Sequence, residues 1–235
     1  LFPYTTLFRS VKLQNAVDHA VVVYGPPRAG ERLAVSEVVA PADRPSRIGR
    51  ERLDHVGVLP CLVSLRVVDK VLDFSRISDK QRRFMEALTR YVAYGGARGG
   101  GKSWSVRAKS KLLALSWPGI KILIVRRTYP ELLNNHINQL RQELNGVARY
   151  AQDKKLLTFR NGSTIKFGYC ANDNDMLQYQ GAEYDVVFID EAAQLKKEWL
   201  DAIDTTVRGT NGFPKRTYYT LNPGGQSHGY FKRLF

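Results

Sequence analysis

Eight consecutive residues carry the types and spacing of a phosphate-binding loop. Residues 96–103 satisfy the pattern G-x-x-x-x-G-K-[ST] and follow a short apolar segment, residues 91–94. Glycines at this density let successive backbone N–H groups face an anion, Lys102 supplies a positive charge to the β- and γ-phosphates, and the Ser103 hydroxyl can ligate Mg²⁺. The sequence therefore predicts a nucleotide-phosphate site formed by Gly96, Ala97, Arg98, Gly99, Gly100, Gly101, Lys102 and Ser103.

Two adjacent carboxylates follow a second apolar segment. Residues 185–189 lead directly into Asp190 and Glu191. In open α/β sheets ligands bind at the carboxyl ends of the strands, so Asp190 is placed to hold Mg²⁺, directly or through a water. Glu191 is then placed to orient and deprotonate an attacking water. A water-activating acid at this position favours hydrolysis over phosphoryl transfer to a substrate hydroxyl.

Composition excludes several classes of protein. A length of 235 residues allows one α/β domain with a core, and no apolar run approaches the length of a membrane span. Two cysteines cannot build a disulfide framework, and the four histidines show no metal-ligand spacing. The 36 lysines and arginines outnumber the 22 acidic residues, which makes a polyanionic partner plausible.

The amino-terminal third differs from the rest of the chain. Residues 1–10 match the in-frame translation of a common sequencing-library adapter, and we leave them out of fold reasoning. Residues 11–70 are rich in proline and lack a sustained helical or strand period, so we interpret them as non-native or disordered. A genuine, loosely structured arm is the alternative. We expect no strand of the central sheet before Val71 and an ordered ATPase domain over residues 71–235.

From residue 78 onward, helical and strand patterns alternate. This alternation predicts an α/β fold with a mostly parallel sheet flanked by helices, interrupted by a β-hairpin insertion that turns at Asn161-Gly162 in a type I′ turn. Ser78 is the expected N-cap of the first helix. Helices are predicted over residues 80–90, 102–117, 130–144 and 196–207 and from about residue 229, and strands over 91–94, 121–125, 156–160, 163–169, 185–189 and 216–221.

The order of these parts resembles the ATPase domain of the large terminase subunit of tailed bacteriophages. The likeness covers residues 73–235. It rests on a glutamine ahead of the first strand and on the segments GGARGGGKS, VRRTYPELL, YQGAEYDVVFIDEAAQ, YYTLNPGG and HGYFKRLF. The resemblance implies a P-loop NTPase of the RecA-like type with an additional strand, in which the strand ending at Leu221 lies between the phosphate-loop strand and the acidic strand.

The resemblance also implies roles for individual residues. Lys102 and Ser103 match the residues that take phosphate and magnesium, Asp190 the metal-binding acid and Glu191 the catalytic base. Arg98 matches an arginine that stabilises the transferred phosphoryl group in cis, with plain electrostatic support of the loop as the alternative.

Three further positions match less specific family motifs. Gln81 matches a glutamine that reads the adenine edge, although a lone glutamine on a helix is often only solvated. Thr220 and Asn222 match a coupling motif that senses the γ-phosphate, and a proline-terminated strand end is the alternative. Arg126 and Arg127 follow a strand as in relatives, where phosphate, DNA and a neighbouring subunit all remain open as their partner.

As a member of this family, the chain would use ATP and Mg²⁺ to move double-stranded DNA into the prohead. The implied partners are DNA, a small terminase subunit, a portal protein and further copies in a ring, in the cytoplasm of the bacterial host and without a membrane. The family's nuclease domain would lie beyond Phe235, and we interpret Asp173 and Asp175 as a solvated turn. A helicase-like ATPase acting on nucleic acid and a basic binding module with an inert nucleotide site are the alternatives.

Overall fold

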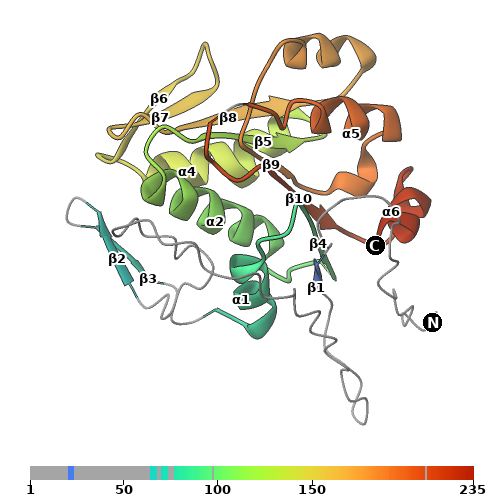
Figure 1. Ribbon diagram of the computed structural model, residues 1–235, viewed down its shortest axis with the longest axis horizontal. Coiled ribbons are helices and arrows are strands. Elements are labelled where there is room, and N and C mark those ends of the chain that lie inside the picture. Colours follow the sequence, from blue (N-terminus) through green and yellow to red (C-terminus); the bar gives the residue numbers. More distant parts are fainter. Residues whose placement is uncertain (1–20, 24–63, 68–69, 74–76, 97, 210) are drawn as a thin grey trace, which may run out of the picture.

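A computed structural model describes residues 21–23, 64–67, 70–73, 77–96, 98–209 and 211–235 of the chain (Figure 1). Its centre is an eight-stranded sheet with the order β1-β4-β10-β9-β5-β8-β7-β6. Neighbouring strands are parallel from β1 to β8, and β7 and β6 continue the sheet antiparallel. The strands are β1 Val21–Val23, β4 Tyr91–Gly95, β10 Arg216–Leu221, β9 Val186–Ile189, β5 Lys121–Arg126, β8 Thr164–Tyr169, β7 Leu156–Phe159 and β6 Ala148–Ala151.

The strand order confirms the expected P-loop NTPase arrangement. β10, which ends at Leu221, lies between β4 and β9 and pairs in parallel with both. The phosphate-loop strand and the acidic strand therefore flank the strand that carries Thr220, and all three have their carboxyl ends at one edge of the sheet.

The expectation that no strand before Val71 joins the central sheet was wrong. β1 pairs in parallel with β4, Val21 lying opposite Val92 and Val23 opposite Tyr94. Three consecutive valines favour an extended backbone. β4 pairs with β10 along one edge, and β1 pairs with the backbone N–H and C=O groups along its other edge. Separately, β2 Ser64–Val67 and β3 Lys70–Asp73 pair as an antiparallel hairpin. The interpretation of residues 1–10 and of most of 11–70 falls outside the described residues and stays a prediction.

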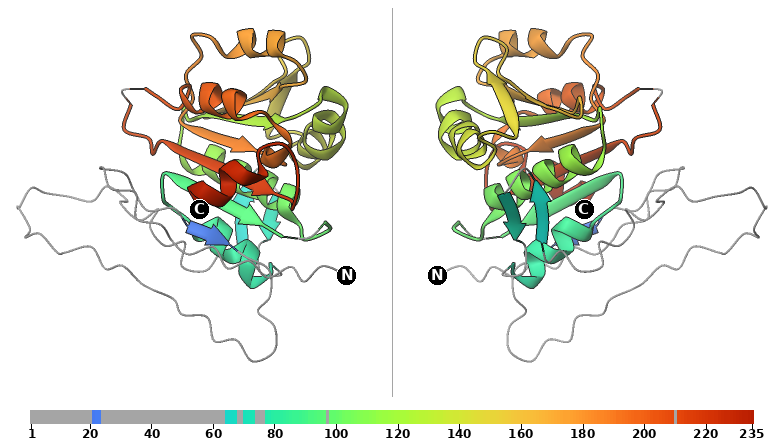
Figure 2. Two further views of the ribbon diagram at one scale, coloured as in Figure 1. Left: turned by 90° about the vertical axis from the view of Figure 1, so that its right-hand side faces the viewer. Right: turned by 90° about the vertical axis from the view of Figure 1, so that its left-hand side faces the viewer.

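Helices cover both faces of the sheet (Figures 1 and 2). One face carries α1 Asp79–Glu86, α2 Lys102–Ser116 and a run made of α3 Tyr129–Leu132, the π-helix η1 Leu133–Ile137 and α4 Asn138–Glu143. The other face carries the 3-10 turns η2 Asp173–Tyr179 and η3 Ala192–Gln194, with α5 Lys197–Asp204 and α6 His228–Leu234.

Side chains of the central strands are buried on both faces, as in parallel sheets covered by helices. In β9, Val186 and Phe188 pack toward α1 and α2, whereas Val187 and Ile189 pack toward α5 and α6. The same alternation holds in β5 and β10. The strands are therefore packed between two apolar layers. This packing fixes the position of the carboxyl edge of the sheet, where Asp190 and Glu191 follow β9.

The first helix begins as predicted but ends earlier. Ser78 accepts the N–H of Gln81 and the Gln81 side chain accepts the N–H of Ser78, forming a capping box. α1 stops at Glu86, whereas the pattern predicted residue 90, because Lys109 reaches across from α2. Its buried ammonium donates to the carbonyl oxygens of Phe84, Met85 and Ala87 at 2.8, 3.0 and 2.7 Å.

The hairpin insertion differs from its predicted form in two ways. Gly162 has a φ of 84°, but Asn161 is not among the residues with positive φ, so the turn is not type I′. The N–H of Gly162 bonds to the carbonyl of Phe159, and the N–H of Phe159 to the carbonyl of Ser163, as in a three-residue loop with a left-handed glycine. Asn161 instead donates its amide to the carbonyl of Ala114, a tertiary contact that holds it in place. β6 adds a third strand that the sequence analysis missed.

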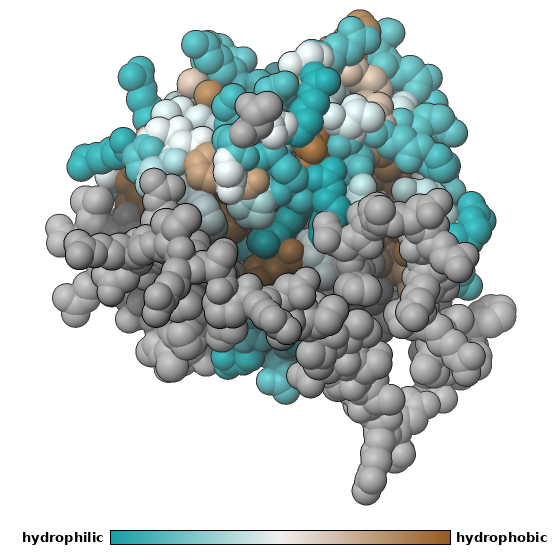
Figure 3. Space-filling view, viewed as in Figure 1, coloured by the Kyte–Doolittle hydropathy of each residue, from teal (hydrophilic) through white to brown (hydrophobic). Residues whose placement is uncertain are grey.

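Where Figure 3 shows residues that the structure describes, their surface is mostly hydrophilic, with apolar residues in small separate areas. Within the described part of the chain, no helix combines the length and the apolar character needed to cross a bilayer.

Candidate nucleotide-binding site

The phosphate-binding loop connects β4 to α2, as predicted. Gly99 and Gly101 have φ values of 78° and 72°, a left-handed backbone that glycine adopts without strain. Lys102 reaches back across the loop, its Nζ lying 3.0 Å from the carbonyl oxygen of Gly96. Burial lowers the pKa of Lys102, and the negative charges of Asp190 and Glu191 oppose this shift. Ala97 lies outside the described residues.

Strand register brings the polar residues of three strands together. Ile189 of β9 lies opposite Tyr219 of β10 and Val125 of β5. The next residues along these strands are Asp190, Thr220 and Arg126, so their side chains meet at the carboxyl edge of the sheet.

Asp190 is fully buried and accepts hydrogen bonds on both carboxylate oxygens. Oδ2 accepts from the Ser103 hydroxyl at 2.9 Å and from Arg126 Nη1 and His136 Nε2, each at 2.8 Å. Oδ1 accepts from the Thr220 hydroxyl. Burial by itself would raise the pKa of Asp190, but the hydrogen bond and charge of His136, the charge of Arg126 and the Thr220 hydroxyl hold it well below its usual range.

These residues fit a magnesium ion bound together with a nucleotide. The Ser103 hydroxyl and the Asp190 carboxylate are hard oxygen donors, 2.9 Å apart, and the carboxylate stays ionised. Because both Asp190 oxygens already accept hydrogen bonds, binding through a water fits this carboxylate better than direct ligation. No group of three or more His, Cys, Asp or Glu side chains among the described residues could hold a metal alone, so phosphate and water oxygens would complete the shell.

Glu191 sits next to this carboxylate in an unusual backbone conformation. Its φ of 56° and ψ of 42° are left-handed, which is strained for a residue other than glycine and is often found at functional sites. The Thr220 hydroxyl accepts its N–H at 2.9 Å. Its carboxylate is held by Arg126 Nη2 at 2.8 Å, by Gln194 Nε2 at 2.5 Å and by Asn222 Nδ2 at 3.3 Å. An oriented carboxylate at this edge can accept a proton from water.

Gln81 and Arg98, the other two residues predicted for the nucleotide site, differ in their positions relative to the phosphate-binding loop. A Cβ atom on Gly101 would stand 2.5 Å from Gln81 Nε2, so the Gln81 side chain lies against the phosphate-binding loop. Arg98 is exposed. Thus the structure brings Lys102, Ser103, Asp190, Glu191, Thr220 and Asn222 together and places Gln81 beside them, while Arg98 stays at the surface.

The sequence analysis missed three residues of the cluster. The sequence left phosphate, DNA and a neighbouring subunit open as partners of Arg126. In the structure Arg126 binds the carboxylates of Asp190 and Glu191, whereas Arg127 is exposed. His136 and Gln194 were given no role. The adjacency of β5 and β9 places Arg126 beside Asp190, and only the order of strands in the sheet reveals that adjacency.

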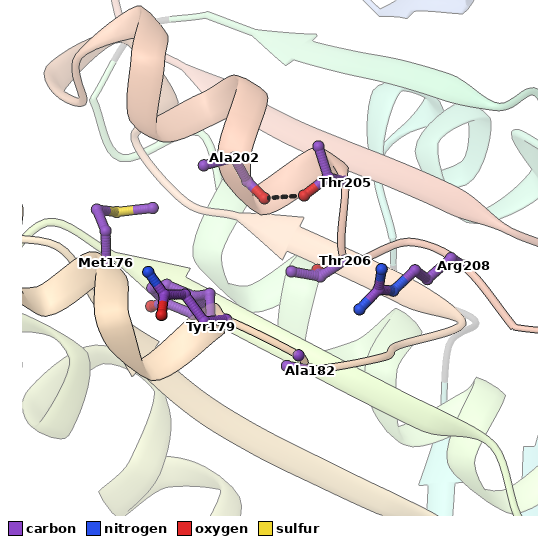
Figure 4. A pocket seen from close by; sticks show the side chains of 9 residues that line it. Met176, Tyr179, Ala182, Ala202, Thr205, Thr206 and Arg208 are labelled. Atoms are coloured by element: carbon purple, nitrogen blue, oxygen red, sulfur yellow. Dashed lines mark hydrogen bonds between the residues drawn. The ribbon is translucent and has the colours of Figure 1, made fainter.

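A separate cavity of about 180 Å³ lies between η2 and the end of α5 (Figure 4). Its lining contains one charged residue, Arg208, together with Met176, Tyr179 and Thr205. None of the residues of the acidic cluster or of the phosphate-binding loop lines it, so it is not part of the nucleotide site.

Asp173 and Asp175 are occupied by protein contacts. Asp173 pairs with Lys196 and accepts the Trp199 Nε1–H at 2.7 Å, while Asp175 accepts the backbone N–H groups of Ala171 and Asn172.

We expect no DNA cleavage from Asp173 and Asp175, since two-metal chemistry needs several converging carboxylates and these two side chains are held by other contacts. Supercoiled plasmid incubated with the chain and Mg²⁺ or Mn²⁺ is expected to stay intact. Nicking that disappears in Asp173→Ala or Asp175→Ala would contradict this prediction.

Comparison with known proteins identifies the family and the fold of this chain. A profile of the family described as terminase large subunit, T4likevirus-type, N-terminal matches residues 93–231. The large terminase of a thermophilic bacteriophage is similar in structure, with 16% identity and a TM-score of 0.55 over 67% of this chain and 42% of that one. The same protein solved with ATP-gamma-S gives a TM-score of 0.53 at 16% identity, over 67% of this chain and 41% of that one.

The large terminase of bacteriophage HK97 matches with 14% identity and a TM-score of 0.50, over 63% of this chain and 33% of that one. At such identities these likenesses show the fold, and this chain spans less than half the length of these relatives. No curated protein sequence matches significantly. The family profile covers more than half of the chain, from β4 through the acidic pair to α6, and the chain therefore belongs to the family of T4-like large terminase subunit N-terminal domains.

Proposed function

We propose that this chain binds Mg–ATP at the phosphate-binding loop and hydrolyses it as the motor domain of a phage large terminase. The observation that carries the proposal is the cluster in which Ser103, Asp190 and Thr220 are joined by hydrogen bonds, with Glu191 next to them in a left-handed conformation. Hydroxyl, metal-binding acid and base meet at the sheet edge where α/β proteins bind ligands.

Each residue has a task in this reaction. Lys102 exchanges the Gly96 carbonyl for the β- and γ-phosphate oxygens of ATP. Ser103 and Asp190 hold Mg²⁺, which when bound neutralises charge on the phosphate oxygens. Glu191 orients the attacking water and takes its proton. Asn222, whose buried Oδ1 has no partner among the described residues, and Thr220 sense the γ-phosphate.

Two residues complete the nucleotide site in this proposal. Arg98, exposed on the loop, turns toward the transferred phosphoryl group in cis and stabilises its charge. Gln81, which lies against Gly101 and is held by the capping box of α1, contacts the adenine edge.

Hydrolysis is coupled to the movement of double-stranded DNA into the prohead. The net charge of +14 supports a polyanionic partner. In this proposal further copies form a ring that works with a small terminase subunit and a portal protein in the cytoplasm of the host bacterium. Family membership supports these partners, which are proposed for the complete protein.

A binding titration tests the nucleotide site directly. Lys102→Ala is expected to weaken Mg–ATP binding by about 10–100-fold, since a charge-assisted hydrogen bond contributes roughly 1.5–3 kcal/mol. The measurement is a titration with a fluorescent ATP analogue in the presence of Mg²⁺. Lys197→Ala, an exposed lysine on α5 that pairs with Asp201, is the matched control and should bind like the parent. Equal affinity of all three proteins would refute the proposed site.

A further inference from the structure

His136 is a buried polar residue that the proposed reaction does not use. Its side chain is completely buried on the same face of the sheet as α2. Nε2 lies 2.8 Å from Asp190 Oδ2, while Nδ1 is buried and has no hydrogen-bond partner among the described residues. Because an ionised carboxylate can only accept a hydrogen bond, Nε2 carries a proton and is the donor to Asp190. An apolar side chain would fill the position without leaving a nitrogen unpartnered, so the contact with Asp190 is what favours an imidazole here.

The local backbone is shaped to make this contact. His136 lies in the π-helix Leu133–Ile137, a widened turn between α3 and α4. Such turns are rare and frequently found at functional sites. Arg107 of α2 donates to the carbonyl oxygen of Asn135 at 2.5 Å, the residue just before His136. Glu143, at the end of α4, pairs with Arg107 and Lys111. The helix that carries His136 is thereby tied to the helix that begins at Lys102.

We propose that His136 is a positioning residue that holds the Asp190 carboxylate in place for the magnesium ion of the bound nucleotide. The inference rests on the proposed function, because it requires Mg–nucleotide to bind beside Ser103. Asp190 has one contact from the phosphate-binding loop, one from β10 and one from Arg126, and His136 adds the only contact from the α3–η1–α4 run among those described. Without its donor, the Oδ2 atom loses one of three partners that set the orientation of the carboxylate.

Two amide substitutions of His136 distinguish a role in holding Asp190 from a role in packing alone. In His136→Gln the amide nitrogen is as far from the backbone as Nε2 and can reach Asp190. In His136→Asn the amide nitrogen takes the place of Nδ1 and cannot. Both variants bury an amide at the same position, so they are matched for the cost of burying a polar group. His136→Leu provides an apolar third variant.

The experiment measures binding of a fluorescent ADP analogue to the full chain, once with MgCl₂ and once with EDTA, beside thermal unfolding of each variant. With Mg²⁺, we expect His136→Asn and His136→Leu to bind about 10-fold more weakly than the parent, as for other partners of metal-binding residues, and His136→Gln to stay within about 3-fold. With EDTA all four proteins should agree within about 3-fold.

Three results would overturn the inference. His136→Gln binding as weakly as His136→Asn would show that the Nε2 donor is not what matters. Equal weakening with and without Mg²⁺ would reduce His136 to a packing residue, and unchanged binding in every variant would remove its role altogether. If the leucine variant does not fold, the glutamine and asparagine pair decides alone. A parent chain that binds no Mg–nucleotide would instead refute the proposed function, and this inference with it.

Discussion

Replacing Glu191 by glutamine is expected to leave ATP bound and to lower the rate of its hydrolysis about 10²–10⁴-fold, the range attributed to a general base. Glutamine keeps the size of the side chain and an oxygen that can accept from Arg126 and Asn222, which hold Glu191 at 2.8 and 3.3 Å. It cannot take a proton from water. Single-turnover phosphate release with excess protein measures the chemical step, and the fluorescent-nucleotide titration measures binding.

The control for this prediction is Glu183→Gln. Glu183 is half exposed and pairs with Arg208 at 3.6 Å, on the side of the molecule that carries the separate cavity. This variant should hydrolyse ATP at the parent rate. If Glu191→Gln loses binding while Lys102→Ala keeps hydrolysis, the assignment of the two residues is wrong. If Glu191→Gln keeps its turnover, another group is the base.

Lys109→Met is expected to lower the free energy of unfolding by about 2–4 kcal/mol, because it leaves buried carbonyl oxygens without a donor. The ammonium bonds to the carbonyl oxygens of Phe84, Met85 and Ala87, and it lies 4.4 Å from the centre of the Tyr218 ring. Tyr218 also donates its hydroxyl to the Ala87 carbonyl, so this oxygen keeps one partner and the other two lose theirs. Methionine preserves the volume, so the change comes from the lost hydrogen bonds and the lost charge and not from a cavity.

Urea unfolding followed by circular dichroism measures this loss, and Lys197→Met is the matched surface control, with an expected change within about 0.5 kcal/mol. A loss below about 1 kcal/mol in Lys109→Met would mean that relief from burying a charge offsets the missing hydrogen bonds. Because Lys109 joins α1 to α2, the variant should also loosen the contact of Gln81 with the phosphate-binding loop, seen as weaker nucleotide binding.

The sequence by itself was sufficient to predict those features whose residues are neighbours in the chain. The phosphate-binding loop from Gly96 to Ser103, the pair Asp190 and Glu191, and the N-cap at Ser78 are each complete within a few residues. Their places in the fold follow from residue type and spacing, so the sequence by itself predicted where they lie. Strand β10 also has the predicted bounds, because a run of β-branched and aromatic residues ends just before Asn222-Pro223.

Only the tertiary structure decided which residues from distant segments meet. Arg126, His136 and Thr220 converge on Asp190 because β5 and β10 flank β9 and because a π-turn carries the histidine inward. The pairing of β1 with β4, the early end of α1 at the Lys109 ammonium and the turn at Gly162 are likewise set by long-range contacts. The physical reason is the same in each case. Burial and hydrogen-bond satisfaction are properties of neighbours in space, and a single chain read in order does not contain them.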